Sequence, residues 1–128
     1  MTIATTTIKV YLNEDENGFF GFHTNKFSQF PATPALRLAV SFDLDERVTG
    51  DPKDNVKLIL SSVFEQLNIG GDLIPASDYT VEYRANRNRS LSVGDVVIVG
   101  ESAYAVASFG WDPVSTDELV AAIGRAGS

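Results

Sequence analysis

The stretch "NRSLSVGDVVIVGESAYAVASFGW", residues 88–111, is the most regularly patterned part of this 128-residue chain and decides its fold. It contains the short apolar run "VVIV", a turn at Gly100 and Glu101, and then "AYAVASF", where small alanines alternate with other residues. A β-branched run, a turn residue and a second alternating run are typical of two antiparallel strands. The sequence therefore predicts a β-hairpin.

The residues before the first strand of this hairpin also fit a structural role. Glycine at position 94 permits an unusual backbone angle, and the carboxylate of Asp95 can accept hydrogen bonds from nearby amides. The hydroxyls of Ser90 and Ser92 can close a turn without taking part in any chemistry. We therefore interpret these four residues as parts of a turn and not as a reaction site.

Two further strands are predicted in the N-terminal half. Residues 5–13 alternate apolar side chains with threonine and other strand-forming residues. Residues 36–45 alternate more clearly, which predicts that one face of this strand carries Leu36, Leu38, Val40, Phe42 and Leu44.

Two helices complete the expected elements. Pro52 suits a first helical position, apolar residues recur at helical spacing up to Leu67, and a glycine pair follows at 70–71, so an amphipathic helix is expected over about 52–68. Ser115 and Glu118 have the spacing of a capping box. They predict a short C-terminal helix with Leu119, Val120 and Ile123 on one side and a frayed tail at 124–128. Residues 79–83 receive no assignment.

Together these elements predict one α+β domain over residues 1–128, with a mainly antiparallel sheet and one principal helix across a face. Composition narrows its function. The chain has no cysteine, so a disulfide, a thiolate nucleophile and a cysteine-ligated metal are all excluded. Its N-terminus lacks the features of a signal peptide, and no apolar run reaches the ~18 residues that span a bilayer. We expect a cytoplasmic protein with no membrane partner.

The acidic balance of the chain bears on its partners. Seventeen acidic and ten basic residues give a net charge of −7, which argues against general affinity for nucleic-acid backbones. The charge has two interpretations: it keeps the protein soluble, or it forms a surface that meets a basic partner or imitates a phosphate backbone.

No catalytic, metal or cofactor residue is predicted. The only histidine, His23, has no motif connecting it to a serine, and no GxSxG elbow, P-loop or calcium loop occurs. Asp43 and Asp45 lie two residues apart on the polar side of a predicted strand. Acidic residues in such positions form a solvated face more often than a catalytic acid–base pair. A small enzyme with an unrecognised site stays as an alternative.

Two surfaces are candidates for binding. Arg84, Arg87 and Arg89 form a local basic cluster, and Tyr83 and Trp111 are candidates to stack a base or an acidic peptide beside it. A solvated loop is the other explanation. The second surface is an aromatic run that contains Phe19 and Phe20 and continues with Phe22, Phe27 and Phe30. It either packs into the core or meets a partner.

The second half of the chain resembles the YodL-like domain family over about residues 56–114. The resemblance rests on a helix that ends with a phenylalanine and an asparagine, on an arginine before "SLSVGD", on a hairpin, and on a closing "Y-x-x-x-x-F-G-W". In this chain the matching residues are Phe64, Asn68, Arg89, Ser90, Leu91, Ser92, Val93, Gly94, Asp95, Tyr104, Phe109, Gly110 and Trp111. Leu67 stands where the family usually has phenylalanine.

The resemblance implies an origin more than an activity. The family is associated with plasmids, conjugative elements and phages, and it supplies no catalytic residues to carry over. It implies a non-enzymatic accessory protein that binds a host protein or protein complex, with inhibition of a host defence system as one possibility. The alternative is a nucleic-acid-binding module that uses Arg84, Arg87 and Arg89.

Overall fold

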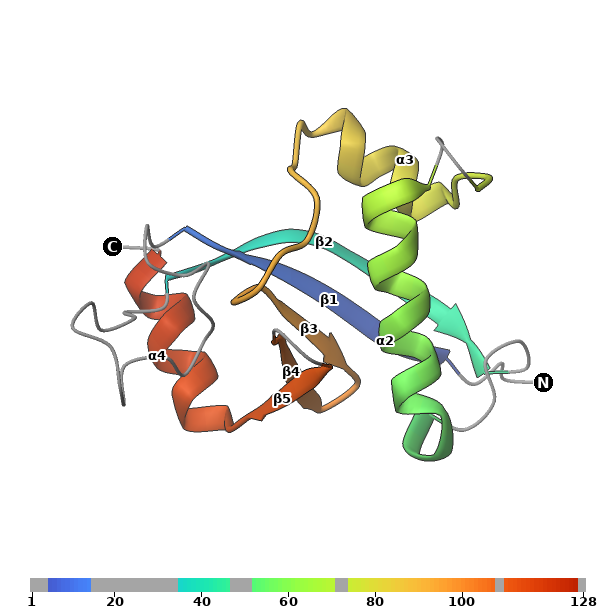
Figure 1. Ribbon diagram of the computed structural model, residues 1–128. Helices are drawn as coiled ribbons and strands as arrows, with labels where there is room; N and C mark the ends of the chain where they lie inside the picture. Colours follow the sequence, from blue (N-terminus) through green and yellow to red (C-terminus); the bar gives the residue numbers. More distant parts are fainter. Residues whose placement is uncertain (1–4, 15–34, 47–51, 71–73, 108–109, 127–128) are drawn as a thin grey trace.

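The computed structural model describes residues 5–14, 35–46, 52–70, 74–107 and 110–126, and these form an antiparallel sheet with helices on both faces (Figure 1). The strand order is β2-β1-β3-β4-β5, and each neighbouring pair is antiparallel. The strands are β1 (Thr5–Asn13), β2 (Leu36–Asp45), β3 (Val96–Val99), β4 (Ser102–Val106) and β5 (Trp111–Val114). The predicted α+β class is confirmed. The aromatic run with Phe19, Phe20 and His23 lies outside the described residues.

The sheet separates two apolar clusters. Helices α2 (Pro52–Ile69) and α3 (Asp78–Ala85) lie on one face, and α4 (Thr116–Ala126) lies on the other (Figure 1). The buried members of the α2-side cluster are Ile8, Val10, Leu12, Val40, Ile59, Leu60, Val63, Leu67, Tyr83, Leu91, Val97 and Val99. Those of the α4-side cluster are Tyr11, Leu36, Val96, Ile98, Ala103, Ala105, Val114 and Ala122. Strands β1 and β3 therefore contribute alternate residues to both clusters.

A β-bulge divides the apolar residues of β2 between these two clusters. Tyr11 pairs with Leu38, whereas the preceding residue of β1 pairs with Val40, so Ala39 is an extra residue in β2. An extra residue reverses the faces of all side chains beyond it. The prediction that the five apolar residues of this strand share one face is wrong, because Leu36 packs with α4 while Val40 packs with α2.

The principal helix forms as predicted. Its apolar residues at helical spacing all pack in the α2-side cluster, four of them buried and Val56 and Phe64 partly buried. The helix ends before Gly70, whose amide donates to the Gln66 carbonyl at 2.9 Å. A Cβ at position 70 would lie 2.3 Å from that carbonyl oxygen, so the close approach requires glycine.

Helix α3 was not predicted from the sequence. Its composition, "DYTVEYRA", favours strand as much as helix. Its start is organised by Gln66 of α2, whose Oε1 accepts from the Ser77 amide at 3.0 Å and from the Thr80 hydroxyl at 2.7 Å. Thr80 and Tyr83 are fully buried, so tertiary contacts hold this segment in a helix against its local preference.

The predicted hairpin is confirmed as β3 and β4. Val97 pairs with Tyr104, and the turn between the strands contains Gly100 at φ 64°. Gly94 also has a positive φ, 97°, at the entrance to β3, as expected for a glycine there. Strand β5 was not predicted separately. It returns beside β4, with Val106 paired to Trp111.

The C-terminal helix begins with the predicted capping box. The Glu118 amide donates to the Ser115 hydroxyl at 3.2 Å, and the Ser115 amide donates to the Glu118 carboxylate at 3.1 Å. Leu119 and Ile123 pack on the α4-side cluster, but Val120 is 63% exposed, so its predicted place on the buried side is wrong. Ala122 is the buried residue instead. The helix continues to Ala126, into the stretch expected to fray.

Candidate functional site

The carboxylate of Asp95 is fully buried immediately before β3 and accepts several hydrogen bonds. Its Oδ1 accepts from the Asn13 amide at 2.8 Å and from Arg89 Nη2 at 2.7 Å. Its Oδ2 accepts from the Ser92 amide at 2.8 Å and from Arg89 Nη1 at 2.6 Å. Two amides and a bidentate guanidinium satisfy a buried carboxylate without any need for a ligand. Asp95 therefore accepts amide hydrogen bonds as expected.

Asn68 attaches the loop before β3 to the end of α2. Its Nδ2 donates to the Leu91 carbonyl at 3.3 Å, and its Oδ1 accepts from the Leu91 amide at 2.7 Å. This pair of bonds satisfies both backbone groups of a buried residue, which would otherwise be costly to bury. Among the residues on which the family resemblance rests, those that take part in the hydrogen bonds around this loop are Asn68, Arg89, Ser90, Leu91, Ser92 and Asp95. Phe109 of that set lies outside the described residues.

The two serines have a different role from the one expected. The turn before β3 is closed by the carbonyl of Ser92, which accepts from the Asp95 amide at 3.1 Å. The Ser92 hydroxyl accepts instead from Arg89 Nη1 at 3.3 Å, and Ser90 is exposed, with its carbonyl accepting from the same nitrogen at 3.1 Å. The expectation that their hydroxyls close the turn is wrong, because backbone groups already do so.

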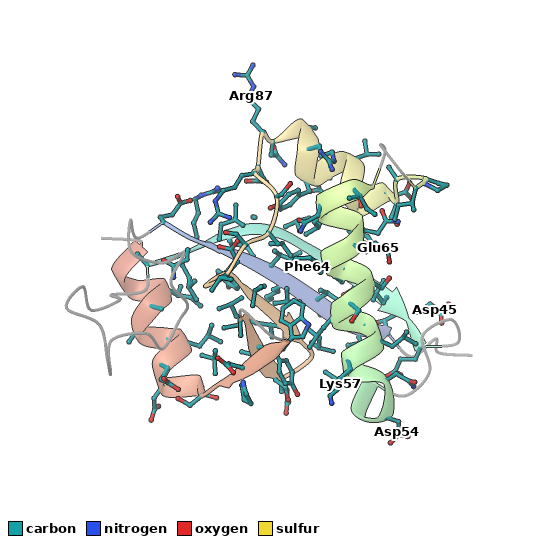
Figure 2. All side chains as sticks on the ribbon, in the orientation of Figure 1. Asp45, Asp54, Lys57, Phe64, Glu65 and Arg87 are labelled. Carbon is teal, nitrogen blue, oxygen red and sulfur yellow. The ribbon has the colours of Figure 1, made fainter. Side chains whose placement is uncertain are left out.

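The arginine cluster mostly supports the fold. Arg89 binds Asp95, and Arg84 Nη2 donates to the Asn68 carbonyl at 3.3 Å, near the end of α2. Arg87 has a positive φ of 60° and points away from the body of the protein (Figure 2). Its side chain forms no hydrogen bond or ion pair with another described residue. The cluster therefore offers Arg87 to a ligand more readily than its other members.

A fourth arginine joins this cluster from a strand far away in the sequence. Arg37 of β2 pairs with Glu14 at 2.5 Å and donates to the Asn88 side chain at 3.1 Å. The contact with Asn88 places it beside the loop that carries Arg87. No local sequence signal connects position 37 with this loop, because β-sheet pairing is what brings them together.

Tyr83 is not available to stack a ligand, contrary to expectation. It is 0% exposed, and its hydroxyl donates to the Arg89 carbonyl. Burial, followed by the negative charge of Asp95, raises the pKa of Tyr83 to about 12, against the opposing effect of nearby arginines. The hydrogen bond to Asp95 raises the pKa of Arg89 above its usual value. Both groups keep their proton at neutral pH.

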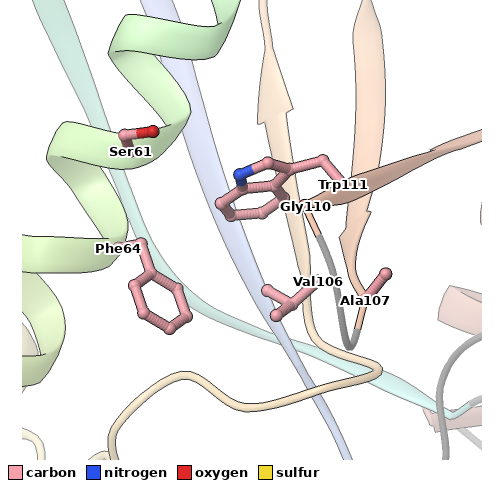
Figure 3. A pocket seen from close by; sticks show the side chains of 6 residues that line it. All are labelled: Ser61, Phe64, Val106, Ala107, Gly110 and Trp111. Carbon is pink, nitrogen blue, oxygen red and sulfur yellow. The ribbon is translucent and has the colours of Figure 1, made fainter.

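Trp111 lies against α2 and not beside a stacking tyrosine. Its ring meets the ring of Phe64 edge to face, with centroids 6.2 Å apart and planes at 87° (Figure 3). Between them and the end of β4 is an open hollow of about 290 Å³. We call it the Trp111 hollow; it is lined by Ser61, Phe64, Val106, Ala107, Gly110 and Trp111.

The Trp111 hollow brings together three distant parts of the sequence. Ser61 and Phe64 are one turn apart on α2, and Trp111 begins β5. Gly110 has a φ of 77°, and nothing lies within 4 Å of the position where a Cβ would be. The space next to this lining residue is therefore unoccupied. The sequence pointed to Phe64 and Trp111 separately, as residues of the family resemblance, but not to their contact, because they are distant in the sequence. It gave no signal for Ser61, which is an ordinary exposed residue of α2.

A second depression, of about 410 Å³, lies on the α4 side of the sheet. It includes Lys9 and Glu101 at its polar part and Ile98 and Leu119 at its apolar part. Its lining is drawn from three strands or turns and from α4, without paired aromatic rings. We therefore regard the Trp111 hollow as the better-formed candidate site.

Within the described ranges, no three histidine, cysteine, aspartate or glutamate side chains gather in a way that could hold a metal ion. Every buried side-chain nitrogen or oxygen in those ranges has a hydrogen-bond partner. None of the described helices has both the length and the apolar character needed to cross a membrane.

Comparison of the chain with protein-family models, with curated proteins and with solved structures found no match.

Proposed function

We propose that this protein acts by binding a protein partner and not by catalysis, and that the Trp111 hollow receives a side chain of that partner. The observation that carries the proposal is the hollow itself, an open depression bordered by Ser61 and by two perpendicular, partly buried aromatic rings. Tryptophan is one of the residue types enriched among the few that carry most of the binding energy in protein interfaces, where the complex excludes water from around them. The Asp95 carboxylate is instead fully buried and accepts four hydrogen bonds.

The alternative of a nucleic-acid-binding module has less support. Such a module needs several cations free to replace counterions along a phosphate backbone. Arg89 and Arg37 are each paired with a carboxylate, and Arg84 donates to a helix carbonyl. Arg87 alone adds little affinity for a polyanion, against a net charge of −7.

The biological setting is part of the same proposal. The sequence resemblance to the YodL-like domain family supports an accessory protein of a plasmid, conjugative element or phage that works in the cytoplasm. The partner would then be a host protein or protein complex, with a defence system as the leading case. The choice of a host protein as partner is supported by the resemblance to the YodL-like family and by the net negative charge of the chain.

Filling the hollow tests the proposed binding site. Ser61 is exposed on α2, so Ser61→Phe places a ring at the hollow while removing no core contact. Ser62→Phe is the matched control, because Ser62 is also exposed on α2 but does not line the hollow. The wild type and both variants would be used to capture partners from extracts treated with nuclease, with quantitative mass spectrometry.

We expect a stoichiometric protein that is retained by the wild type and by Ser62→Phe, and reduced about tenfold or more by Ser61→Phe. A partner retained equally by all three proteins would place the interface elsewhere. Loss of all bound material on nuclease treatment would favour the nucleic-acid module, and replacing Arg87 would then be the next test.

A further inference from the structure

The depression on the α4 side of the sheet has a lining of a different kind from that of the Trp111 hollow. It is bordered by α4 and by strands β1 and β3, and we call it the α4 depression. Its volume of about 410 Å³ falls within the range of small-molecule sites, which measure about 300–1,000 Å³. Two side chains of opposite charge, Lys9 and Glu101, both line it.

The geometry of β1 explains why these polar groups share one cavity. Lys9 and Tyr11 are two residues apart on β1, so both side chains lie on the face that α4 covers, where Tyr11 belongs to the α4-side cluster. The turn that carries Glu101 is attached to the same strand, because the Gly100 amide donates to the Thr7 carbonyl at 2.9 Å. One strand and the turn beside it therefore bring an ammonium, a phenol hydroxyl and a carboxylate to the α4 depression.

The contacts within the fold leave these three polar groups available. Lys9 and Glu101 are exposed, and neither forms an ion pair with the other or with any other described residue. Tyr11 is 8% exposed, and its hydroxyl has no hydrogen-bond partner among the described residues. Since every buried side-chain oxygen in those residues has a partner, this hydroxyl reaches solvent, and the α4 depression is the cavity that Tyr11 lines.

Aliphatic side chains form the other part of the lining. Leu119 and Ile123 lie one turn apart on α4 and are partly buried, and Ile98 of β3 supplies the sheet side. Such a wall gains free energy when an aliphatic group covers it. A ligand that matches the whole lining combines a negative group, a positive group and a short aliphatic chain.

We infer that the α4 depression binds a free α-amino acid with a branched aliphatic side chain. Lys9 and the Tyr11 hydroxyl donate to its carboxylate, Glu101 accepts from its ammonium, and its side chain lies against the aliphatic wall. Glu101 repels a ligand that is only anionic, and Lys9 repels one that is only cationic, so the pair selects a zwitterion. This inference is independent of the proposed protein partner, because the α4 depression and the Trp111 hollow lie on opposite faces of the sheet.

The probes are L-leucine and three analogues that each lack one of its features. Isocaproate lacks the ammonium, isoamylamine lacks the carboxylate, and glycine lacks the aliphatic side chain. Each would be titrated into the full-length protein, with binding followed through the backbone amide resonances of Ile98 and Leu119 in two-dimensional NMR spectra. The design separates the contribution of each group to the affinity.

Lys9→Gln and Glu101→Gln each remove one of the two charges. Both positions are exposed, so the folded state should persist, and unchanged resonances away from the α4 depression would verify this. Lys57→Gln and Glu82→Gln are the matched controls, because these residues are exposed on helices α2 and α3, on the other face of the sheet.

We expect leucine to bind about tenfold or more tightly than each analogue, because a polar group of the site is left unpaired when its counterpart is missing. In Lys9→Gln the advantage of leucine over isoamylamine should disappear, and in Glu101→Gln its advantage over isocaproate should disappear. The two control variants should keep both preferences.

Three results would overturn the inference. The first is isocaproate or isoamylamine binding as tightly as leucine, because one charge would then be sufficient. The second is leucine affinity unchanged in Lys9→Gln or in Glu101→Gln, and the third is the absence of saturable resonance shifts with leucine. None of these results affects the proposed function, which is tested by partner capture at the Trp111 hollow.

Discussion

At the scale of single residues, the Asp95 carboxylate is the group whose loss should matter most. In Asp95→Asn one acceptor oxygen becomes an NH₂ donor that faces amide or guanidinium donors, and the charge that holds Arg89 is removed. Arg89 is about half exposed, 45%, so water compensates part of this loss. We expect a decrease of about 2–3 kcal/mol in the free energy of unfolding, measured by urea denaturation.

Asp43→Asn is the matched control for this change. Asp43 accepts from the Thr7 hydroxyl at 2.7 Å but is exposed on β2, where water replaces a lost hydrogen bond. Its substitution should change the free energy of unfolding by about 0.5 kcal/mol or less. Equal effects of the two substitutions would contradict the importance that we assign to the buried carboxylate.

Tyr83 makes the protein sensitive to alkaline pH. Its pKa is raised to about 12 in the folded state from an ordinary value of 10.0, mainly by burial. The folded state therefore holds the proton more tightly, so this contribution to stability is complete below pH 10 and is lost as the pH rises towards 12. We expect the free energy of unfolding to fall by about 1.4 kcal/mol per pH unit from this residue across that window.

Tyr83→Phe tests this assignment. The variant loses the hydrogen bond to the Arg89 carbonyl and should be less stable by about 1 kcal/mol at neutral pH. Its stability should nevertheless decline less steeply between pH 10 and 12 than that of the wild type, as followed by denaturation at several pH values. Parallel declines in both proteins would assign the alkaline sensitivity to other groups, such as Tyr79, whose pKa burial also raises.

At the scale of elements, the junction between α2 and α3 depends on a close backbone approach at Gly70. In Gly70→Ala the new Cβ would lie 2.3 Å from the Gln66 carbonyl oxygen, which is backbone and cannot rotate away. We expect a loss of about 1–3 kcal/mol in the free energy of unfolding and weaker protection of the α3 amides in hydrogen exchange.

Gly100→Ala is the control for Gly70→Ala, because it introduces backbone strain at a positive φ without a steric clash. Gly100 has a positive φ of 64°, and the nearest atom to a Cβ there is 3.9 Å away. Its substitution should cost about 1 kcal/mol through backbone strain alone, and should leave the exchange of α3 amides unchanged. If it affected α3 as strongly as Gly70→Ala, the proposed local clash would be wrong.

At the scale of the whole molecule, both described edges of the sheet are poorly suited to strand addition. Edge strand β2 contains the bulge at Ala39, and Asn88 Nδ2 covers the carbonyl of that residue at 3.4 Å. The opposite edge strand, β5, has four residues, and one of them is Pro113, which lacks an amide donor. We expect a monomer by analytical ultracentrifugation over a wide range of protein concentration. A mass that doubles with concentration would show that another surface mediates self-association.

Elements whose signals are local could be predicted from neighbouring residues alone. Alternation of apolar and polar residues predicted β1, helical spacing of apolar residues predicted α2, and the turn at Gly100 predicted the β3–β4 hairpin. Each of these signals depends only on residues that are close together in the sequence. The capping box at Ser115 is of the same kind. The turn chemistry of the segment before β3 also predicted that Asp95 accepts hydrogen bonds from nearby amides.

Features that arise between distant segments depend on packing in three dimensions and could not be predicted from local patterns. The bulge at Ala39 depends on how β1 pairs with β2, and α3 is held as a helix by Gln66 of another element. The burial of Tyr83 and the contact between the rings of Phe64 and Trp111 likewise result from the packing of helices on one face of the sheet. A sequence pattern records the preferences of a segment, whereas its neighbours in space set its register, its burial and its free surface.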